Sequence, residues 1–341
     1  MRCACLLIIM KQKYFSTSVV DVYKNQALEK ALFEKADKDE VILFLWRNDN
    51  TVVIGKNQDV FSEVKVDTLL ADGGHIARRI SGGGAVYHDL DNLNFTFIAS
   101  ADNYDIPKQL SVITNAINTI GINSKATGRN DIEIDGRKFS GNAFYRSGCV
   151  CLHHGTIMTR CSREKIERYL AVDGDKLKSN GVCSVRARVC SLSDFCPGVT
   201  VEGVASALKK AFGEVYGGEV EPLDEGRYSA VAEVRTAEFS NEKWIYNSSK
   251  SFESEMRKRF SWGGFCLKFN RQNGRIAEAK ITTDSLETEI FKRLERSLLG
   301  TAATKEDIAR TVEGLLAADG EEKGIRDDIA KFVLENGTEE L

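Results

Sequence analysis

Residues 78–89 read RRISGGGAVYHD, and this stretch carries the strongest signal for fold and function in the chain. Its three consecutive glycines stand between two apolar segments that favour strands. Because glycine lacks a Cβ, such a run can adopt positive φ and lets a ligand approach the backbone. Successive N–H groups in a turn of this kind can converge on an anion. The two arginines before the glycines suit phosphate or carboxylate, so the stretch predicts a site for a phosphate-bearing ligand.

The glycine spacing excludes two common nucleotide-binding motifs. A Walker A loop needs Gly-Lys-Ser/Thr and a following helix, and a Rossmann fingerprint needs a different spacing of its glycines. Taken alone, a glycine-rich hairpin with solvated arginines explains the stretch equally well.

Length and composition exclude several classes of protein. The chain has 341 residues, enough for two domains or for one large domain with an appendage. A formal net charge of −3 gives no reason to expect nucleic-acid binding. Residues 3–10 are apolar but too short to span a membrane, and no small-residue cleavage site follows them. We therefore expect a cytoplasmic protein that binds neither nucleic acid nor membrane.

The cysteines and histidines indicate neither disulfides nor a metal centre. The 9 cysteines include no CxxC pair, which favours reduced, buried thiols. The 4 histidines also lack metal-ligand spacing. On a strand, His153 and His154 would point to opposite faces.

Hydrophobic periodicity favours an α+β fold with a mixed or antiparallel sheet, because strands and helices interleave and many connections are short. The pattern predicts helices at 23–34, 61–70, 110–120 and 163–170, and strands at 41–46, 51–54, 76–80, 85–88, 93–99 and 151–158. We expect the strands at 41–46 and 51–54 to form a hairpin.

A domain boundary is predicted near residue 240, because residues 224–241 are polar and weakly periodic. This gives domains at 1–240 and 241–341. In the second domain the pattern predicts strands at 264–270 and 275–282 and helices at 288–299 and 305–318.

A second polar site is predicted on a hairpin. Asp135-Gly136 is a strong two-residue turn signal. In a regular hairpin this turn would pair Glu133 with Lys138, Ile132 with Phe139, and Asp131 with Ser140. The core face would then hold Ile132, Ile134 and Phe139, and the opposite face would hold Asp131, Glu133, Lys138 and Ser140. From the hairpin alone, a solvent-facing Glu133–Lys138 ion pair worth less than about 1 kcal/mol explains these charges better than a site does.

Several stretches together resemble the lipoate–protein ligases. The stretch at 78–90 (RRISGGGAVYHDL) is similar to the signature of this family, although Asp91 stands where the family has glycine. Four more similar stretches lie in the family's order at 55–58 (GKNQ), 128–144 (GRNDIEIDGRKFSGNAF), 154–156 (HGT) and 184–189 (SVRARV). The stretch RFSWGGFCLKFN, followed by ITTDSL, resembles the accessory domain of the longer bacterial members.

This resemblance implies a biotin/lipoate ligase-like catalytic domain with a small α+β accessory domain after it. It also implies an enzyme that uses ATP and Mg²⁺ to convert lipoate into lipoyl-AMP and transfers the lipoyl group to a lysine of a carrier. The implied carriers are the apo lipoyl domains of 2-oxoacid dehydrogenase complexes and the glycine cleavage H protein. Similar ligases begin close to Met10, which suggests an extension or a misassigned start codon.

The resemblance also assigns roles to residues. Lys138 aligns with a lysine that contacts both ATP and lipoate, and is the expected catalytic residue. The expected ATP contacts are Arg78, Gly83, Gly84, Ala85, Val86, Asn130, Asp131 and Lys138. The expected lipoate contacts are Lys138, Ser81 and His88, with Asp131 as the Mg²⁺ ligand. The resemblance further implies that residues 176–188 close over the adenylate. Arg79 would face away from Arg78 on a regular strand, so we expect it to be structural or peripheral.

Other activities compete with the ligase. A cysteine acyltransferase would move octanoyl or lipoyl groups through a thioester without ATP, and Cys149 and Cys151 lie just before the two histidines. A non-catalytic lipoate or nucleotide sensor is a third candidate. A biotin ligase fits less well, because its basic GRGRxG-type loop is replaced by RRISGGG.

Overall fold

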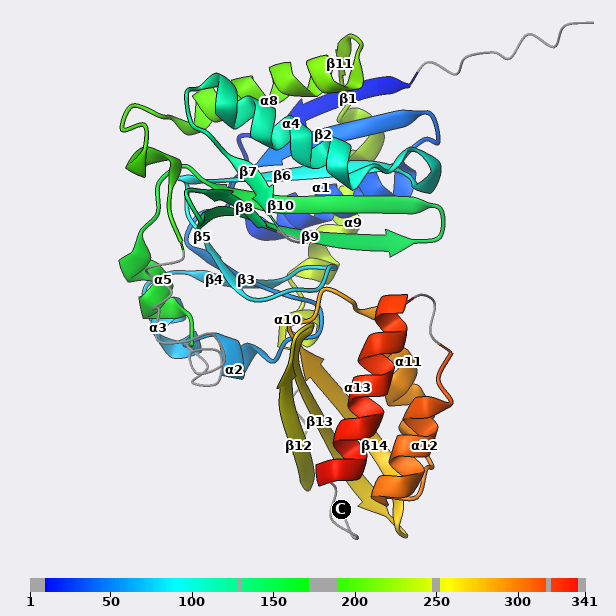
Figure 1. Ribbon diagram of the computed structural model, residues 1–341. Helices are drawn as coiled ribbons and strands as arrows, with labels where there is room; N and C mark the ends of the chain where they lie inside the picture. Colours follow the sequence, from blue (N-terminus) through cyan, green and yellow to red (C-terminus); the bar gives the residue numbers. More distant parts are fainter. Residues whose placement is uncertain (1–9, 128–130, 172–188, 247–251, 317–319, 337–341) are drawn as a thin grey trace, which may run out of the picture. The chain divides into compact units, whose positions relative to one another are not determined.

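The computed structural model describes residues 10–127, 131–171, 189–246, 252–316 and 320–336 (Figure 1). The chain groups into two compact units. The first unit holds most of the chain up to Ile245, and the second holds residues 246–341 together with residues 54–63 and 79–85. The expected boundary near residue 240 stays a prediction.

The first unit is built on a mixed sheet, which has eight strands in the part of the chain that the structure describes. In sheet order these are β11 (Val220–Pro222), β1 (Lys11–Ser16), β2 (Glu40–Trp46), β6 (Asn92–Ser100), β10 (Val150–Met158), β9 (Arg137–Ser147), β8 (Asp131–Ile134) and β7 (Lys125–Thr127). β1 runs parallel to β2 and β11, and antiparallel pairs form the rest. The expected α+β class with a mixed sheet is confirmed.

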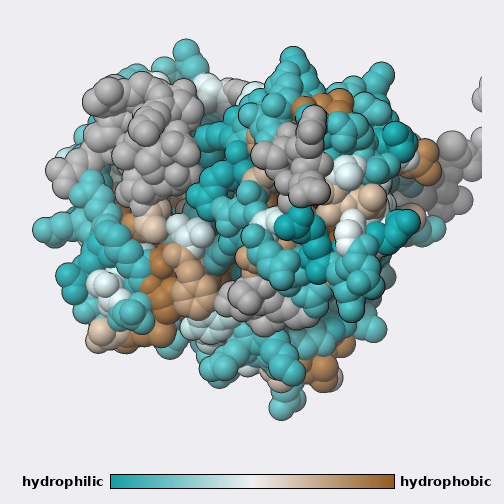
Figure 2. All heavy atoms as spheres, turned by 90° about the horizontal axis from the view of Figure 1, so that it is seen from below, coloured by the Kyte–Doolittle hydropathy of each residue, from teal (hydrophilic) through white to brown (hydrophobic). Residues whose placement is uncertain are grey.

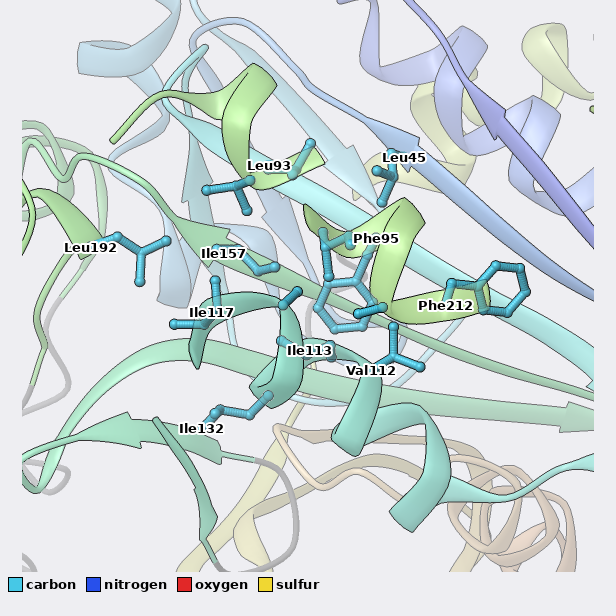
Figure 3. Close-up of a cluster of buried hydrophobic side chains, with 14 of the residues drawn as sticks. Leu45, Leu93, Phe95, Val112, Ile113, Ile117, Ile132, Ile157, Leu192 and Phe212 are labelled. Carbon is cyan, nitrogen blue, oxygen red and sulfur yellow. The ribbon is translucent and has the colours of Figure 1, made fainter. Parts of the chain in front are cut away.

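Helices cover both faces of this sheet (Figure 1). On one face lie α4 (Ile106–Thr119) and α8 (Val201–Tyr216), and on the other lie α1 (Val22–Lys35) and α9 (Gly226–Phe239). The main core fills the space under α4 and α8, where side chains such as Phe95, Ile113 and Phe212 are fully buried (Figure 3). Alternate residues of the central strands point into this core, as strand geometry requires.

Helix α1 begins where the sequence predicts. The Asp21 carboxylate accepts hydrogen bonds from the backbone N–H groups of Tyr23 and Lys24, which caps the helix. The polar segment before residue 240 is not a linker, however, because its residues 226–239 form α9 against α1. Its polarity arises because α9 buries only Tyr228 and Phe239 and contacts α1 through ion pairs such as Arg235–Glu34.

A small second sheet has the order β4–β3–β5, from β4 (His75–Arg78), β3 (Thr51–Ile54) and β5 (Val86–His88). The expected hairpin of β2 and β3 is therefore wrong, since β2 pairs with β1 and β6 instead. The helix expected at 61–70 is also interrupted, into α2 (Val60–Glu63) and α3 (Val66–Ala71). The break follows from a bridge between Val64 and Leu170 and from the Lys65 N–H, which donates to the Tyr169 carbonyl.

The second unit has its own sheet and core. Its antiparallel strands are β12 (Ser254–Phe260), β13 (Gly263–Gln272) and β14 (Arg275–Thr283), and its helices include α11 (Glu289–Leu298), α12 (Lys305–Glu313) and α13 (Gly320–Asn336). Aromatic and aliphatic side chains such as Phe269, Phe291 and Ile329 form the core between them. The sequence predicted β13, β14, α11 and α12 but missed β12 and α13.

The surface is mixed in character. On the face shown in Figure 2, hydrophilic residues predominate and hydrophobic residues form smaller groups between them. Among the described residues, no helix is both long enough and apolar enough to cross a membrane.

His153 is a buried neutral histidine inside the first unit. Its side chain is 0% exposed, and its ring nitrogens lie 2.9 Å from Gln109 Oε1 and 2.8 Å from Asn142 Oδ1. Burial, helped by the nearby His154, lowers the pKa of His153 to about 3. As predicted, His154 points to the opposite face, where its Nδ1 lies 2.8 Å from Glu29 Oε1 on α1.

The low pKa of His153 predicts an acid-sensitive fold. Unfolded His153 takes up a proton near pH 6.5, whereas the folded protein does so only near its pKa of about 3. The free energy of unfolding therefore falls as pH drops from 6.5 toward 3, by up to about 1.4 kcal/mol per pH unit. Between pH 7 and 5, urea unfolding should show the parent losing about 2 kcal/mol more than His153→Gln. Equal losses in the two proteins would contradict a buried neutral imidazole.

Candidate functional site

The glycine loop, residues 79–85, connects β4 to β5 and is held from inside by Arg79. The Arg79 guanidinium donates to the carbonyl oxygens of Gly82 at 2.7 Å and Gly84 at 2.8 Å, and to Ser81 Oγ at 3.1 Å. Gly83 has a φ of 90°, and a Cβ there would lie 2.9 Å from Arg79 Nη2. The loop conformation therefore depends on a glycine at position 83 and on the arginine that the sequence assigned a structural role.

The loop is also enclosed by other residues of the second unit. A Cβ added to Gly55 would lie 2.1 Å from the Gly83 carbonyl oxygen, so only glycine fits there. The N–H of Gly83 donates to the Ser285 carbonyl at 2.9 Å, and a Cβ on Gly82 would lie 2.4 Å from that same oxygen. Gly55 begins the GKNQ stretch and Ser285 lies in the ITTDSL stretch. Three separate motifs of the sequence thus meet at one loop.

Arg78, at the end of β4, has the largest fully buried side chain among the residues that the structure describes, and it is 1% exposed. Its guanidinium donates to the Ile245 carbonyl at 2.7 Å in α10 (Glu242–Tyr246), while the Trp244 indole N–H donates back to the Arg78 carbonyl at 2.9 Å. The expected contact of Arg78 with phosphate stays a prediction.

His88, on β5, lies beside a buried aromatic ring. Its Nδ1 is 3.0 Å from Asn48 Nδ2, and its ring meets that of Trp46 edge-on with centroids 6.5 Å apart. The side chain is 3% exposed. His88 is thus a buried residue packed against Trp46, and its expected contact with lipoate stays a prediction.

The hairpin that carries Lys138 has the predicted turn and part of the predicted register. Asp135 and Gly136 have positive φ values of 49° and 73°, as the turn requires, and Glu133 pairs with Lys138. Beyond this pair the register shifts, so Ile132 pairs with Ser140 and Asp131 with Gly141. The expected pairs Ile132–Phe139 and Asp131–Ser140 are therefore wrong.

The cause of the shift is a β-bulge, in which two residues of one strand oppose one of its partner. Phe139 and Ser140 both oppose Ile132, and both are 0% exposed. Ser140 therefore belongs to the buried side of the hairpin and not to the polar face with Lys138. Turn chemistry predicted the turn, but nothing in the residue types marked the bulge.

Lys138 and Asp131 form an ion pair on the polar face. The Lys138 Nζ is 2.6 Å from Asp131 Oδ1, and each side chain is 34% exposed. At this exposure the pair adds little to stability. It instead places an ammonium group and a carboxylate side by side where solvent or a ligand reaches both. Asn130 and residues 176–188 lie outside the described residues.

Sequence reasoning missed a buried polar cluster between α1 and the sheet. Thr96 Oγ1 donates to Glu29 Oε1 at 2.6 Å and accepts from the Trp46 indole N–H at 3.0 Å, and His154 contacts the same Glu29 oxygen. Glu29 is 2% exposed. A glutamate inside the apolar stripe of the helix predicted at 23–34 indicated a buried charge, but nothing in the sequence marked its partners.

The cysteine alternative finds no support in the site geometry. Cys151 is 3% exposed, and burial raises the pKa of its thiol. A protonated thiol is a poor nucleophile at neutral pH. Both neighbouring histidines are already engaged, His153 with Gln109 and Asn142, and His154 with Glu29.

The mixed α+β sheet with its glycine-rich loop and the small α+β unit that follows it have the fold of the lipoate ligase class. The Lipoyl protein ligase A/B catalytic domain family matches residues 21–213, and the Bacterial lipoate protein ligase C-terminus family matches residues 249–331. The chain belongs to the lipoate–protein ligase family. It is a two-domain ligase that joins lipoate to carrier protein at the expense of ATP.

Individual relatives agree with this assignment. Lipoate-protein ligase A of Psychrobacter cryohalolentis is 34% identical over 95% of this chain and 98% of its own length. The protein of the same name from Bdellovibrio bacteriovorus is 35% identical over 86% of this chain and 89% of its own length.

Solved structures agree in fold. P. falciparum LipL1, solved in complex with lipoate, matches with a TM-score of 0.84 and 28% identity, over 95% of this chain and 100% of its own. A lipoate-protein ligase A bound with ATP matches with a TM-score of 0.61 and 25% identity, over 70% and 99%. A Thermoplasma acidophilum bipartite ligase, described with its E2 lipoyl domain, matches with a TM-score of 0.63 and 26% identity, over 72% and 100%.

The close packing of the glycine loop predicts unequal effects of two similar substitutions. In Gly82→Ala the new Cβ would lie 2.4 Å from the Ser285 oxygen and 2.6 Å from the Leu286 oxygen, which are backbone atoms and cannot move cheaply. We expect a loss of about 1–3 kcal/mol in the free energy of unfolding. In Gly84→Ala the new Cβ meets nothing within 4 Å.

Thermal unfolding of the two variants measures this difference. Gly84→Ala should unfold within about 1 °C of the parent, while Gly82→Ala should unfold several degrees lower. Equal midpoints for the two variants would show that the loop does not pack on Ser285 in solution.

Proposed function

We propose that Lys138 is the catalytic residue that holds lipoate and ATP together for adenylation. A lipoate carboxylate oxygen attacks the α-phosphorus of ATP, a new P–O bond forms, and the bond to pyrophosphate breaks. Both reactants are anions, and negative charge builds up around phosphorus in the transition state. A fixed cation between them offsets their repulsion and orients them, which is most of what such a reaction needs from a protein.

The observation that carries this proposal is the ion pair on the polar face of the hairpin. Lys138 Nζ lies 2.6 Å from Asp131 Oδ1, and both side chains remain partly open. Without substrate, the carboxylate of Asp131 neutralises the ammonium. We propose that the lipoate carboxylate and the α-phosphate replace it when they bind, so that the lysine bridges the two substrates.

The displaced Asp131 is suited to hold the Mg²⁺ ion that accompanies ATP. A free carboxylate is a hard oxygen ligand of the type that Mg²⁺ takes beside substrate phosphates. Mg²⁺ would supply charge neutralisation on the triphosphate. We therefore propose Asp131 as the Mg²⁺ ligand and Asn130, its neighbour in the sequence, as a contact to the nucleotide.

The glycine loop is the proposed holder of the triphosphate. The N–H of Gly83 donates to a carbonyl oxygen in the structure, so its direction already suits an oxygen acceptor. We propose that phosphate oxygens replace that carbonyl and extend to the N–H groups of Gly84, Ala85 and Val86. Arg78 would contribute its buried charge. A guanidinium bonded to phosphate pairs two ionised groups and can do so through two parallel N–H···O bonds.

The lipoate tail is proposed to run across the sheet toward Trp46. Directly paired residues connect the two places: Asp131 with Gly141, Gly141 with Thr156, Thr156 with Asn94, and Asn94 with Trp46. Paired residues share a face, so this row leads from the lysine to the ring beside His88. We propose that Ser81 and His88 contact lipoate along the way.

The second half-reaction needs no enzyme nucleophile. The lysine amine of a carrier attacks the acyl carbon of lipoyl-AMP, an amide bond forms, and AMP leaves. A relative has been described with its E2 lipoyl domain, so lipoyl domains are the carrier class. We propose the apo lipoyl domains of 2-oxoacid dehydrogenase complexes and the glycine cleavage H protein as the carriers, and the cytoplasm as the place of reaction.

Removal of the lysine should stop adenylation. Lys138→Ala should lose lipoate-dependent exchange of pyrophosphate into ATP by at least about 10³-fold, because the cation proposed to bridge the two anions is then gone. Cys149→Ala and Cys151→Ala should exchange at the rate of the parent. A trapped acyl-thioester in the parent, together with an inactive cysteine variant, would instead establish the acyltransferase.

Replacement of the lysine by arginine tests its position rather than its charge. Arginine keeps the charge but spreads it over a larger planar group that cannot occupy the same place. A misplacement of about 1 Å costs about 10²-fold in rate. Lys138→Arg should therefore show an exchange rate reduced about 100-fold, with a thermal midpoint equal to that of the parent. Near-normal exchange would mean that a generic positive charge suffices.

A further inference from the structure

Gly141 lies under the ammonium group of Lys138. A Cβ built on Gly141 would be 3.0 Å from both Lys138 Cε and Lys138 Nζ. That spacing is closer than ordinary van der Waals contact between such atoms. The end of the lysine side chain therefore occupies space that any other residue at position 141 would fill.

This arrangement exists because of the β-bulge. In a regular strand, residues three apart point to opposite faces. Here Lys138 pairs with Glu133 and Gly141 pairs with Asp131, and those two partners are two residues apart on one face. Lys138 and Gly141 therefore share that face. The bulge between them brings the lysine over the glycine, within reach of Asp131.

The backbone carbonyl of Gly141 packs closely against a second glycine, Gly155. A Cβ on Gly155 of β10 would lie 2.5 Å from the Gly141 carbonyl oxygen and 2.6 Å from Phe95 Cζ. Phe95 is 0% exposed in the main core. The position of Gly141 is thus fixed by packing that extends into the core, so a side chain at 141 would move the lysine and not the strand.

From this geometry we infer that Gly141 is a positioning residue for adenylation: its missing side chain sets where the Lys138 ammonium rests. This inference rests on the proposed role of Lys138. In Gly141→Ala the flexible end of the lysine would give way by a few tenths of an ångström or more. The ammonium would then no longer bridge carboxylate and α-phosphate at the same point, although its charge and the fold remain.

The first measurement is the rate of lipoate-dependent pyrophosphate exchange. We expect Gly141→Ala to lower kcat by about 10- to 100-fold while the KM for ATP changes less than about threefold, because a displaced cation affects the reacting geometry most. Gly198→Ala is the matched control, since Gly198 is exposed and a Cβ there meets nothing within 4 Å. It should keep the parent rate.

A double-mutant cycle separates positioning from damage to the strand. The ligand is a hydrolysis-resistant lipoyl-sulfamoyl analogue of lipoyl-AMP, and its Kd is measured by calorimetry for the parent, Gly141→Ala, Lys138→Ala and the double variant. If Gly141 acts through the lysine, Gly141→Ala weakens binding at least about fivefold in the parent but less than twofold in the Lys138→Ala background.

The outcomes distinguish the positioning role of Gly141 from the catalytic role of Lys138. An equal weakening by Gly141→Ala in both backgrounds would overturn the inference, because the damage would not pass through Lys138. Parent-like exchange and binding by Gly141→Ala would also overturn it. If Lys138→Ala itself leaves exchange and binding unchanged, the proposed catalytic role of the lysine fails, and the inference with it.

Discussion

The ion pair between Lys138 and Asp131 is the interaction around which the proposed site is arranged. One irregularity, the bulge at Phe139 and Ser140, determines which residue lies beside this pair. A regular hairpin would have placed Ser140 beside the lysine and Gly141 on the far face. Because of the bulge, Gly141 lies beside the lysine in place of Ser140. The Lys138 ammonium group occupies the space that a side chain at position 141 would fill.

The glycine loop of the second unit also depends on positions where only glycine fits. Arg79 occupies the inside of the loop, and glycines at positions 55 and 82 allow other backbone to approach from outside. Backbone carbonyl oxygens are the nearest neighbours at both of these glycines, and neither position has room for a side chain. Such close packing defines the direction of the loop's N–H groups before any ligand arrives, so less ordering remains to be done on binding.

The accuracy of sequence-based prediction varied with the kind of signal. Turn chemistry is local, so Asp135-Gly136 predicted a turn that the structure confirms, and the helix predicted from residue 23 begins at Val22. Which strands pair depends on residues far apart in the chain. The predicted pairing of β2 with β3 was wrong because it rested only on their being adjacent in the sequence. The bulge and the Glu29–His154 contact left no local signal. They follow from tertiary packing, which residue types alone do not encode.

A crystal structure of the chain with a hydrolysis-resistant lipoyl-sulfamoyl analogue of lipoyl-AMP tests the central claim most directly. The quantity to measure is the distance from Lys138 Nζ to the acyl carbonyl oxygen and to the sulfamoyl oxygens that stand for the α-phosphate. The account predicts that the ammonium leaves Asp131 and lies within about 3 Å of both groups. A bound analogue with Lys138 still paired to Asp131 and remote from the acyl group would contradict it.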